Sequence, residues 1–343
     1  MRNLLLLLLV LAGLGLPARA EREGSPALQV ETMLAGTRVM APETFRNLAV
    51  FPVRVPSTSD LPHHLNLDSA LENSSLRITE VSDAGSVNEL KVENAGKVPV
   101  FLMAGEILSG AKQDRVLQDD LWLLARSGPV AVACYCVERG RWHYSGGTDF
   151  KSRPAAGNVA VRSSARATNS QAAVWDAVAE TQAKVGYGGS TALGETYEAP
   201  EVKRDLDGYL GALRDLPRRH PEANGFVVVV GPRILAADLF GGRADAVALW
   251  PKLLPSYALE ATREDSGRPG VDRGAVTRFL REAATARVTT RATPGEGTLV
   301  SLEGEDLVGS ALLIGRALAH AELFPGRTPP AKTPSPIQRN YSR

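Results

Sequence analysis

The stretch that decides the fold is Val98–Trp142, which reads VPVFLMAGEILSGAKQDRVLQDDLWLLARSGPVAVACYCVERGRW. Three apolar runs in this stretch are separated by two polar segments. The first polar segment extends from Gly105 to Arg115, and the second from Glu138 to Trp142. Short apolar runs bounded by glycine and polar residues are typical of buried strands. The stretch therefore predicts β-structure with polar side chains gathered where strands end.

The residues before this stretch continue the β-pattern. Phe45–Val55, Leu76–Val81 and Val87–Val92 have strand-like lengths, and turn residues separate them. Residues 21–40 are polar and mixed, and they predict no clear element. Short strands at close spacing, with glycine and proline in the turns, favour a sandwich or roll for this half.

The second half of the chain has the periodicity of helices. Residues 151–170 are rich in Ser, Ala, Gly and Arg without a period, which predicts a long loop. Apolar stripes at helical spacing follow, and Trp175 on the first of them is expected in the core. The expected helices are Gln171–Val185, Val202–Leu216, Ala244–Leu259 with a kink near Pro251, and Gly274–Thr285. The expected strands are Phe226–Val230, Ile234–Leu239, Arg287–Arg291 and Gly297–Glu303, with a last strand or helix at Leu307–Phe324.

Together these patterns predict an α+β fold. We expect a β-rich N-terminal half, a sandwich or roll, packed with several amphipathic helices from the C-terminal half. The expected organisation is a single domain over residues 45–325. A proline-rich, polar and basic tail over residues 326–343 is expected to be disordered.

The first twenty residues have the three parts of a secretory signal peptide. Arg2 gives a positive start, Leu4–Leu16 is apolar, and Ala18-Arg19-Ala20 is a small-residue cleavage site. The apolar run is shorter than the roughly 20 residues that a spanning helix needs. We therefore expect cleavage after Ala20 and an exported protein, periplasmic or extracellular, with no membrane association afterwards.

The charge of the chain gives no general attraction for polyanions. The chain carries 39 basic and 38 acidic residues, and removing residues 1–20 takes away two arginines and no acid. The mature chain would then carry 37 basic residues against 38 acidic ones, a net charge of −1. A chain so close to neutral is not expected to bind nucleic acid, so any anion site must be a local cluster.

The two cysteines, Cys134 and Cys136, lie two residues apart in the strongest predicted strand. That spacing puts their Cα atoms about 6.5 Å apart, near the upper limit for a disulfide. An exported protein could form one disulfide between them, but we favour two free cysteines whose small side chains are buried on one strand face.

The two polar segments hold the chemistry-bearing side chains. Lysine and arginine suit phosphate or carboxylate oxygens, and a carboxylate among them could serve as a general base. An internal ion-pair network tying strand ends together is the alternative interpretation. No metal-binding, Walker A or nucleophile-elbow motif is found, and no metal is expected. The candidate ligand-binding residues are Glu106, Lys112, Gln113, Arg115, Glu138, Arg141 and Trp142.

We also expect the two polar segments to form one site. Each segment follows an apolar run that we expect to be a strand. If these two strands are parallel, with a third strand between them, both segments lie at the same end of the sheet. An antiparallel neighbour relation would put them at opposite ends.

Four blocks of the sequence resemble one known family. They read VNELKVENAGKVPVFLMAGEILSGAKQDRVL, CVERGRW, QAAVWDAV and GFVVVVGPRILAADLFGGRADAVALWPKLLPSYALEA, in this order. They are similar to the ARG and rhodanese-phosphatase-superfamily-associated protein domain, in which ARG stands for ADP-ribosylglycohydrolase. The resemblance runs from about Phe45 to Phe324. The chain departs from the family pattern at Ile107, Asp114 and Arg139, where the family usually has Glu, Asn and Gln.

The resemblance implies a role near NAD or ADP-ribose metabolism by genomic association. The leading hypothesis is an exported protein that binds a small anionic ligand, such as a nucleotide or ADP-ribose derivative, at the two polar segments. An enzyme at the same place, with Glu106 or Glu138 as general base, is the second hypothesis. A structural or protein-interaction module is the third. The residues do not decide whether the chain is an enzyme, and they name no cofactor.

Overall fold

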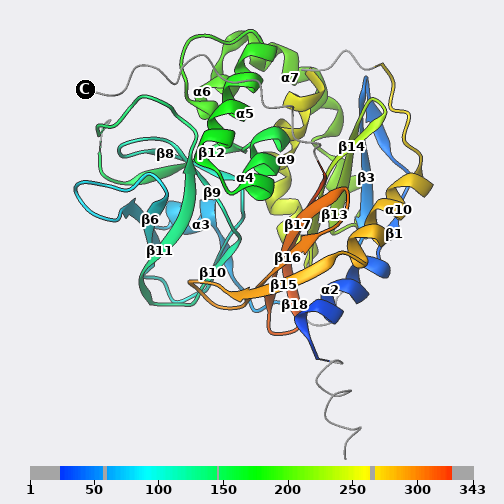
Figure 1. Cartoon of the computed structure of the whole chain (residues 1–343), viewed down its shortest axis with the longest axis horizontal. Helices are drawn as coiled ribbons and strands as arrows, with labels where there is room; N and C mark the ends of the chain where they lie inside the picture. The colour runs from blue at the N-terminus through cyan, green and yellow to red at the C-terminus, as the bar shows by residue number, and fades with distance from the viewer. Residues whose placement is uncertain (1–23, 57–59, 145–146, 263–266, 327–343) are drawn as a thin grey trace, which may run out of the picture.

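A computed structural model of the chain describes residues 24–56, 60–144, 147–262 and 267–326. Its largest element is a nine-stranded antiparallel sheet, which lies on the right in Figure 1. The strands of the main path follow the order β1 (Arg38–Val39), β3 (Leu48–Arg54), β13 (Gly225–Val230), β14 (Arg233–Phe240), β18 (Ala317–Pro325), β17 (Leu307–Ile314), β16 (Thr298–Glu303) and β15 (Arg287–Ala292). The ninth strand, β2 (Glu43–Phe45), pairs with β3.

The stretch that decides the fold supplies three of the six strands of a second sheet, which lies on the left in Figure 1. Its six strands follow the order β12 (Phe150–Ala156), β8 (Glu106–Gly110), β9 (Arg115–Leu117), β11 (Ser127–Cys136), β6 (Glu89–Asn94) and β5 (Leu76–Glu80). A small third sheet is formed by β10 (Leu121–Leu123), β7 (Val100–Leu102) and β4 (Leu65–Asn66).

Helices fill the space between the sheets and cover the outer face of the larger one (Figure 1). Helix α9 packs against β12 of the six-stranded sheet and against β13 and β14 of the nine-stranded sheet. The helices of this inner group are α4 (Val159–Thr168), α5 (Gln171–Lys184), α6 (Leu193–Glu198), α7 (Pro200–Leu213), α8 (Leu216–Arg219) and α9 (Arg243–Thr262). The remaining helices are α2 (Pro26–Ala35), α3 (Leu67–Glu72) and α10 (Arg273–Ala284).

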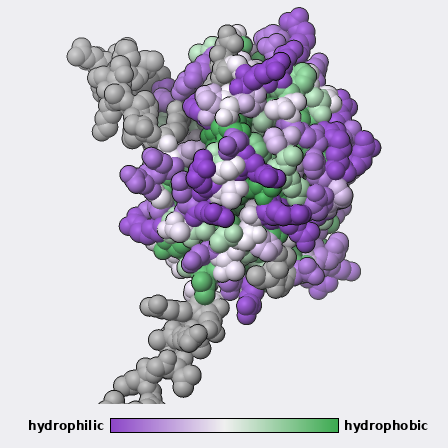
Figure 2. All heavy atoms as spheres, turned by 90° about the vertical axis from the view of Figure 1, so that its right-hand side faces the viewer, coloured by the Kyte–Doolittle hydropathy of each residue, from purple (hydrophilic) through white to green (hydrophobic). Residues whose placement is uncertain are grey.

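The central strand β13 shows why one sheet can carry two cores. Val228 and Val230 belong to the core that faces α9, whereas Val227 and Val229 belong to the core under α2 and α10. Because both faces are covered, the strand is apolar at consecutive positions instead of alternating. The outer surface over α2 and α10 faces the viewer in Figure 2 and carries mostly hydrophilic side chains.

The α+β class is confirmed, and most of the predicted helices and strands are present. Residues 151–170 are a correction: they form β12 and helix α4 instead of a long loop. The prediction failed because the inward face of α4 carries arginines, among them Arg162, and so has no ordinary apolar stripe. Helix α9 also continues through Pro251 and Pro255.

Three smaller expectations are also corrected. Residues 26–35 form helix α2, which is capped by Ser25, whose side chain accepts a hydrogen bond from the Leu28 N–H. Residues 307–325 form the hairpin β17–β18, turned at Gly315, whose φ of +58° favours glycine. Trp175 is only partly buried, because the inward face of α5 is built by Val174, Ala177 and Val178 instead.

The expected signal peptide and almost all of the expected tail lie outside the described residues. Among the helices that the structure describes, none combines the length and apolar character needed to cross a bilayer.

Candidate functional site

The two polar segments meet, but the strand geometry differs from the prediction. Arg115 opens β9 and pairs with Cys136 at the end of the antiparallel strand β11. The first segment contains β8 and the turn that leads into β9, so its last residues meet the second segment through the antiparallel pairing of β9 with β11. The Gln113 side chain donates to the Glu138 carbonyl at 2.9 Å, and the Asp114 N–H donates to Glu138 Oε2 at 2.9 Å.

Arg141 is the centre of the joined segments. Its guanidinium donates to both oxygens of Glu138, at 2.7 and 2.6 Å, and to the Ala111 carbonyl at 2.8 Å. A further contact of 3.3 Å reaches Asp114. Burial acts to raise the pKa of Glu138, but hydrogen bonds from Arg141 and the Asp114 N–H outweigh it and lower that pKa. Glu138 is therefore ionised at neutral pH and bound on both oxygens.

Arg115 supports the cluster from inside. Its side chain is fully buried, and its guanidinium donates to the Gln113 carbonyl at 2.9 Å and to the Ser86 carbonyl at 3.2 Å. The single proton of the Cys136 thiol is shared between two acceptors, Gln113 Oε1 at 3.1 Å and the Glu138 carbonyl at 2.9 Å. Arg115 and Gln113 are thus held by internal partners and fix the shape of the turn.

The solvent-facing part of the cluster is a lysine beside two aromatic rings. The Lys112 ammonium lies 5.7 Å from the ring centre of Trp142 and 4.8 Å from that of Tyr144. Both rings are exposed, at 41% and 39%. We call Lys112, Trp142 and Tyr144 the aromatic face. A hollow of 320 Å³ adjoins it, lined by Tyr144, Glu80, Arg77, Lys91 and neighbouring residues.

Glu106 takes part in a different cluster. It opens β8, is 1% exposed, and accepts hydrogen bonds from the Met103 N–H at 2.9 Å and from Lys252 Nζ at 2.5 Å. Lys252 Nζ also donates to Ser152 Oγ and to Asp68 Oδ1, each at 2.7 Å. We call these four residues the Lys252 cluster. The one sequence signal for it was a lone lysine in the apolar segment ALWPKLLPSYAL, which was not used.

The Lys252 cluster does not activate Ser152 as a nucleophile. Burial acts to lower the pKa of Lys252, but Glu106 and Asp68 outweigh it and raise that pKa. A general base must be able to take the serine proton. Lys252 is charged at neutral pH and so donates to Ser152 instead.

A larger ion network lies in the core and was not anticipated. Arg162 contacts Asp238 and Glu322, and His320 lies between Asp238 and Asp120. These residues are at most 3% exposed, so the network ties α4 to the nine-stranded sheet and opens to no ligand. The other members are Asp119, Arg166 and Tyr257.

Gly105 belongs to this core network. It has a φ of +86°, and a Cβ atom there would meet the Arg162 side chain at 2.8 Å. In the structure it makes room for an internal arginine.

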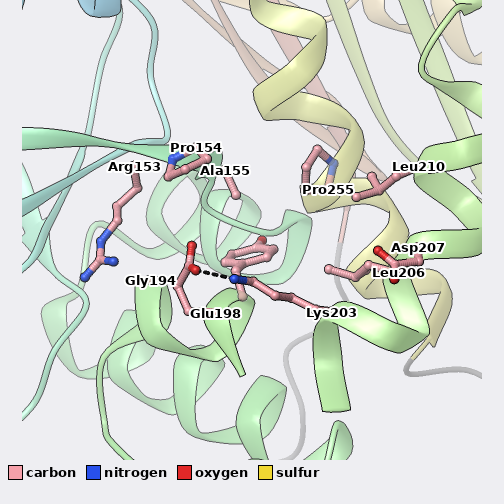
Figure 3. A pocket seen from close by; sticks show the side chains of 11 residues that line it. Arg153, Pro154, Ala155, Gly194, Glu198, Lys203, Leu206, Asp207, Leu210 and Pro255 are labelled. Atoms are coloured by element: carbon pink, nitrogen blue, oxygen red, sulfur yellow. Dashed lines mark hydrogen bonds and ion pairs between the residues drawn. The ribbon is translucent and has the colours of Figure 1, made fainter. Parts of the chain in front are cut away.

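An apolar cavity of 140 Å³ lies between α6, α7, α9 and β12 (Figure 3). Leu206, Leu210 and Pro255 form part of its wall, and Lys203 pairs with Glu198 at 2.6 Å beside it. The volume is close to that of engineered cavities that hold benzene. Acidic and basic groups occur equally around it, so its lining favours neither an anionic nor a cationic ligand.

The cysteines carry no nucleophilic chemistry. Both are free and buried, in agreement with our interpretation. Burial raises the pKa of Cys134 to about 12 and raises that of Cys136, so both remain thiols at neutral pH. Within the described ranges, no group of three or more His, Cys, Asp or Glu side chains could hold a metal ion.

The chain was compared with known families and proteins. The model of the ARG and Rhodanese-Phosphatase-superfamily-associated Protein domain matches residues 36–324, which is most of the chain. No curated protein and no solved structure matches the chain.

Proposed function

Because the chain belongs to the ARG and Rhodanese-Phosphatase-superfamily-associated Protein domain family, we propose a ligand of the nucleotide or ADP-ribose class. Such a ligand is a small anion with a flat ring. The contact groups are Lys112, Trp142 and Tyr144 of the aromatic face. Gln113, Arg115, Glu138 and Arg141 position them. We further propose that the protein is exported and that the signal peptide is removed after Ala20.

The observation that carries this proposal is the exposed pair of aromatic rings around one ammonium group. Aromatic rings present π-faces on which a base can stack, a contact worth about 1–3 kcal/mol per base. Lys112 supplies a charge for a phosphate within reach of the same rings. The internal hydrogen bonds of Arg141 and Arg115 hold the turn that carries Lys112, so the face is organised before a ligand arrives.

Binding has more support than catalysis at this place. A general base needs a free oxygen within hydrogen-bond reach of the substrate. Glu138 is bound on both oxygens by Arg141, and Asp114 contacts Arg141 and Arg153. Glu106 belongs to the Lys252 cluster and makes its contacts away from the aromatic face.

Tryptophan fluorescence gives a direct test. Trp122 and Trp250 are buried, Trp175 is partly buried, and Trp142 is exposed. Stacking on Trp142 should therefore quench the emission when ADP-ribose, NAD or AMP is titrated into the protein, and adenosine should bind more weakly because it lacks phosphate. Trp142→Phe should remove the quenching signal, whereas the matched control Trp175→Phe should keep it.

Lys112→Met tests the charge. Loss of about 1 kcal/mol of charged contact corresponds to a roughly fivefold weaker affinity for AMP, with adenosine unchanged. Ligand binding that is insensitive to Lys112→Met and leaves Trp142 emission unchanged would refute the proposed site.

A further inference from the structure

We propose that Lys252 anchors a second ligand site, which takes the carboxylate of a small organic acid through the cleft between α3, β5 and β12. This site is separate from the aromatic face and does not depend on the function proposed for it. In the protein without a ligand, Asp68 occupies the position that the ligand carboxylate would take.

The first reason is the way in which Lys252 is held. Its side chain is buried, and its three ammonium protons are directed at Glu106, Ser152 and Asp68. A buried ammonium group needs a full set of partners because its desolvation is costly. Two partners, Glu106 and Ser152, come from strands β8 and β12 of one sheet and are fixed there.

The second reason is the contrast between the two carboxylates. The Glu106 side chain is 1% exposed, and its other oxygen accepts from the Met103 N–H. The Asp68 side chain is 50% exposed and lies on α3, a helix of six residues. Asp68 can therefore turn into water and regain its hydration, whereas Glu106 cannot. When Asp68 turns away, one of the three ammonium protons of Lys252 loses its acceptor on the side of the cleft and can donate to a ligand instead.

The third reason is the cleft itself. Asp68 and Ser152 line a cleft of 640 Å³, within the range of small-molecule sites. Leu71 supplies apolar surface for a carbon chain. Lys151 adds one positive charge to the wall, whereas Arg77 is paired with Asp149 at 3.4 Å and Glu72 adds a negative charge. Because the group now in contact with Lys252 is itself a carboxylate at 2.7 Å, a ligand carboxylate can reproduce the same contact.

The ligand must displace Asp68, and this leads to a specific test. Asp68→Asn removes the competing charge and should strengthen the binding of succinate, used as the probe, by roughly tenfold in calorimetry. Glu72→Gln is the matched control, because it removes the same charge from the same helix and the same cleft without touching Lys252. That control should change the affinity by less than about twofold.

Removal of the anchor should abolish binding. The double variant Glu106→Gln/Lys252→Met replaces the buried charged pair by uncharged side chains of similar size, and it should show no succinate binding. Equal effects of Asp68→Asn and Glu72→Gln would overturn the proposal, as would retained binding by the double variant. Preference for inorganic phosphate over succinate would overturn the carboxylate assignment. If the double variant does not fold, the comparison of Asp68→Asn with Glu72→Gln decides alone.

Discussion

Raising the pH from 6.5 to 8.5 should destabilise the protein, because the unfolded chain loses the His320 proton in this interval whereas the folded protein still holds it. This side chain is fully buried, with Nδ1 3.0 Å from Asp120 Oδ2 and Nε2 3.1 Å from Asp238 Oδ1. Each ring nitrogen faces a carboxylate, so both must carry a proton for both contacts to be favourable. A neutral imidazole would direct one lone pair at a buried carboxylate.

The magnitude follows from the proton affinity of His320. Burial acts to lower its pKa, but Asp120 and Asp238 outweigh burial and raise the pKa from 6.5 to about 10. A group with a raised folded-state pKa stabilises the fold fully below its unfolded pKa, and this contribution is lost as the pH rises through the folded pKa. Each pH unit in between costs up to about 1.4 kcal/mol, so the interval from 6.5 to 8.5 costs at most roughly 3 kcal/mol.

Urea unfolding at several pH values measures this slope. The interval stops at pH 8.5 because the two cysteines also have raised pKa values, and their ionisation in the unfolded chain would add to the loss at higher pH. His320→Gln keeps a hydrogen-bond donor but does not titrate, so its unfolding free energy should vary much less over the same interval. Equal slopes in the two proteins, or a flat profile in the wild type, would refute the argument.

Three further predictions concern the core, the cysteines and the N-terminus. Arg162→Met leaves buried carboxylates without their partner and should lower the free energy of unfolding in urea by about 3–5 kcal/mol. Arg287→Ala, at an exposed ion pair, should lower it by less than about 1 kcal/mol. Similar losses in the two variants would contradict the role of the core network. Cys134 and Cys136 should react with a thiol reagent at pH 7 only after unfolding, because both are buried and protonated; rapid labelling of the native protein would disprove this. Intact-mass measurement of protein from its native host should show loss of residues 1–20, and retention of Met1 would disprove the proposed export.

Helices with one apolar stripe were predictable from the sequence because the spacing of neighbouring apolar residues is enough to identify their buried face. The ranges Val202–Leu216 and Gly274–Thr285 correspond to α7 and α10, in which residues three or four positions apart enter the core. Strand β13 was predictable for a related reason, since five consecutive apolar residues leave no polar face for solvent.

Helix α4 could not be predicted in this way. Its inward side chains include Arg162 and Arg166, which in a sequence are typical of a solvent-facing surface. Asp238, a partner of Arg162, lies 76 residues away, and Glu322, a partner of Arg166, lies 156 residues away. No local pattern therefore shows that the buried positive charges are neutralised. Burial of charge depends on a partner that only the fold supplies.

The same limit separates Glu106 from the other candidate residues. Glu106 lies six positions before Lys112 in the sequence, which suggested one site. Glu106 and Gly110, however, lie at opposite ends of strand β8, and a strand rises about 3.3 Å per residue, which puts their Cα atoms roughly 13 Å apart. Glu106 at the start of β8 and Lys112 after its end therefore lie at opposite ends of the sheet. For this reason Glu106 finds its partner in Lys252, 146 residues along the chain, and the two proposed sites can be tested independently.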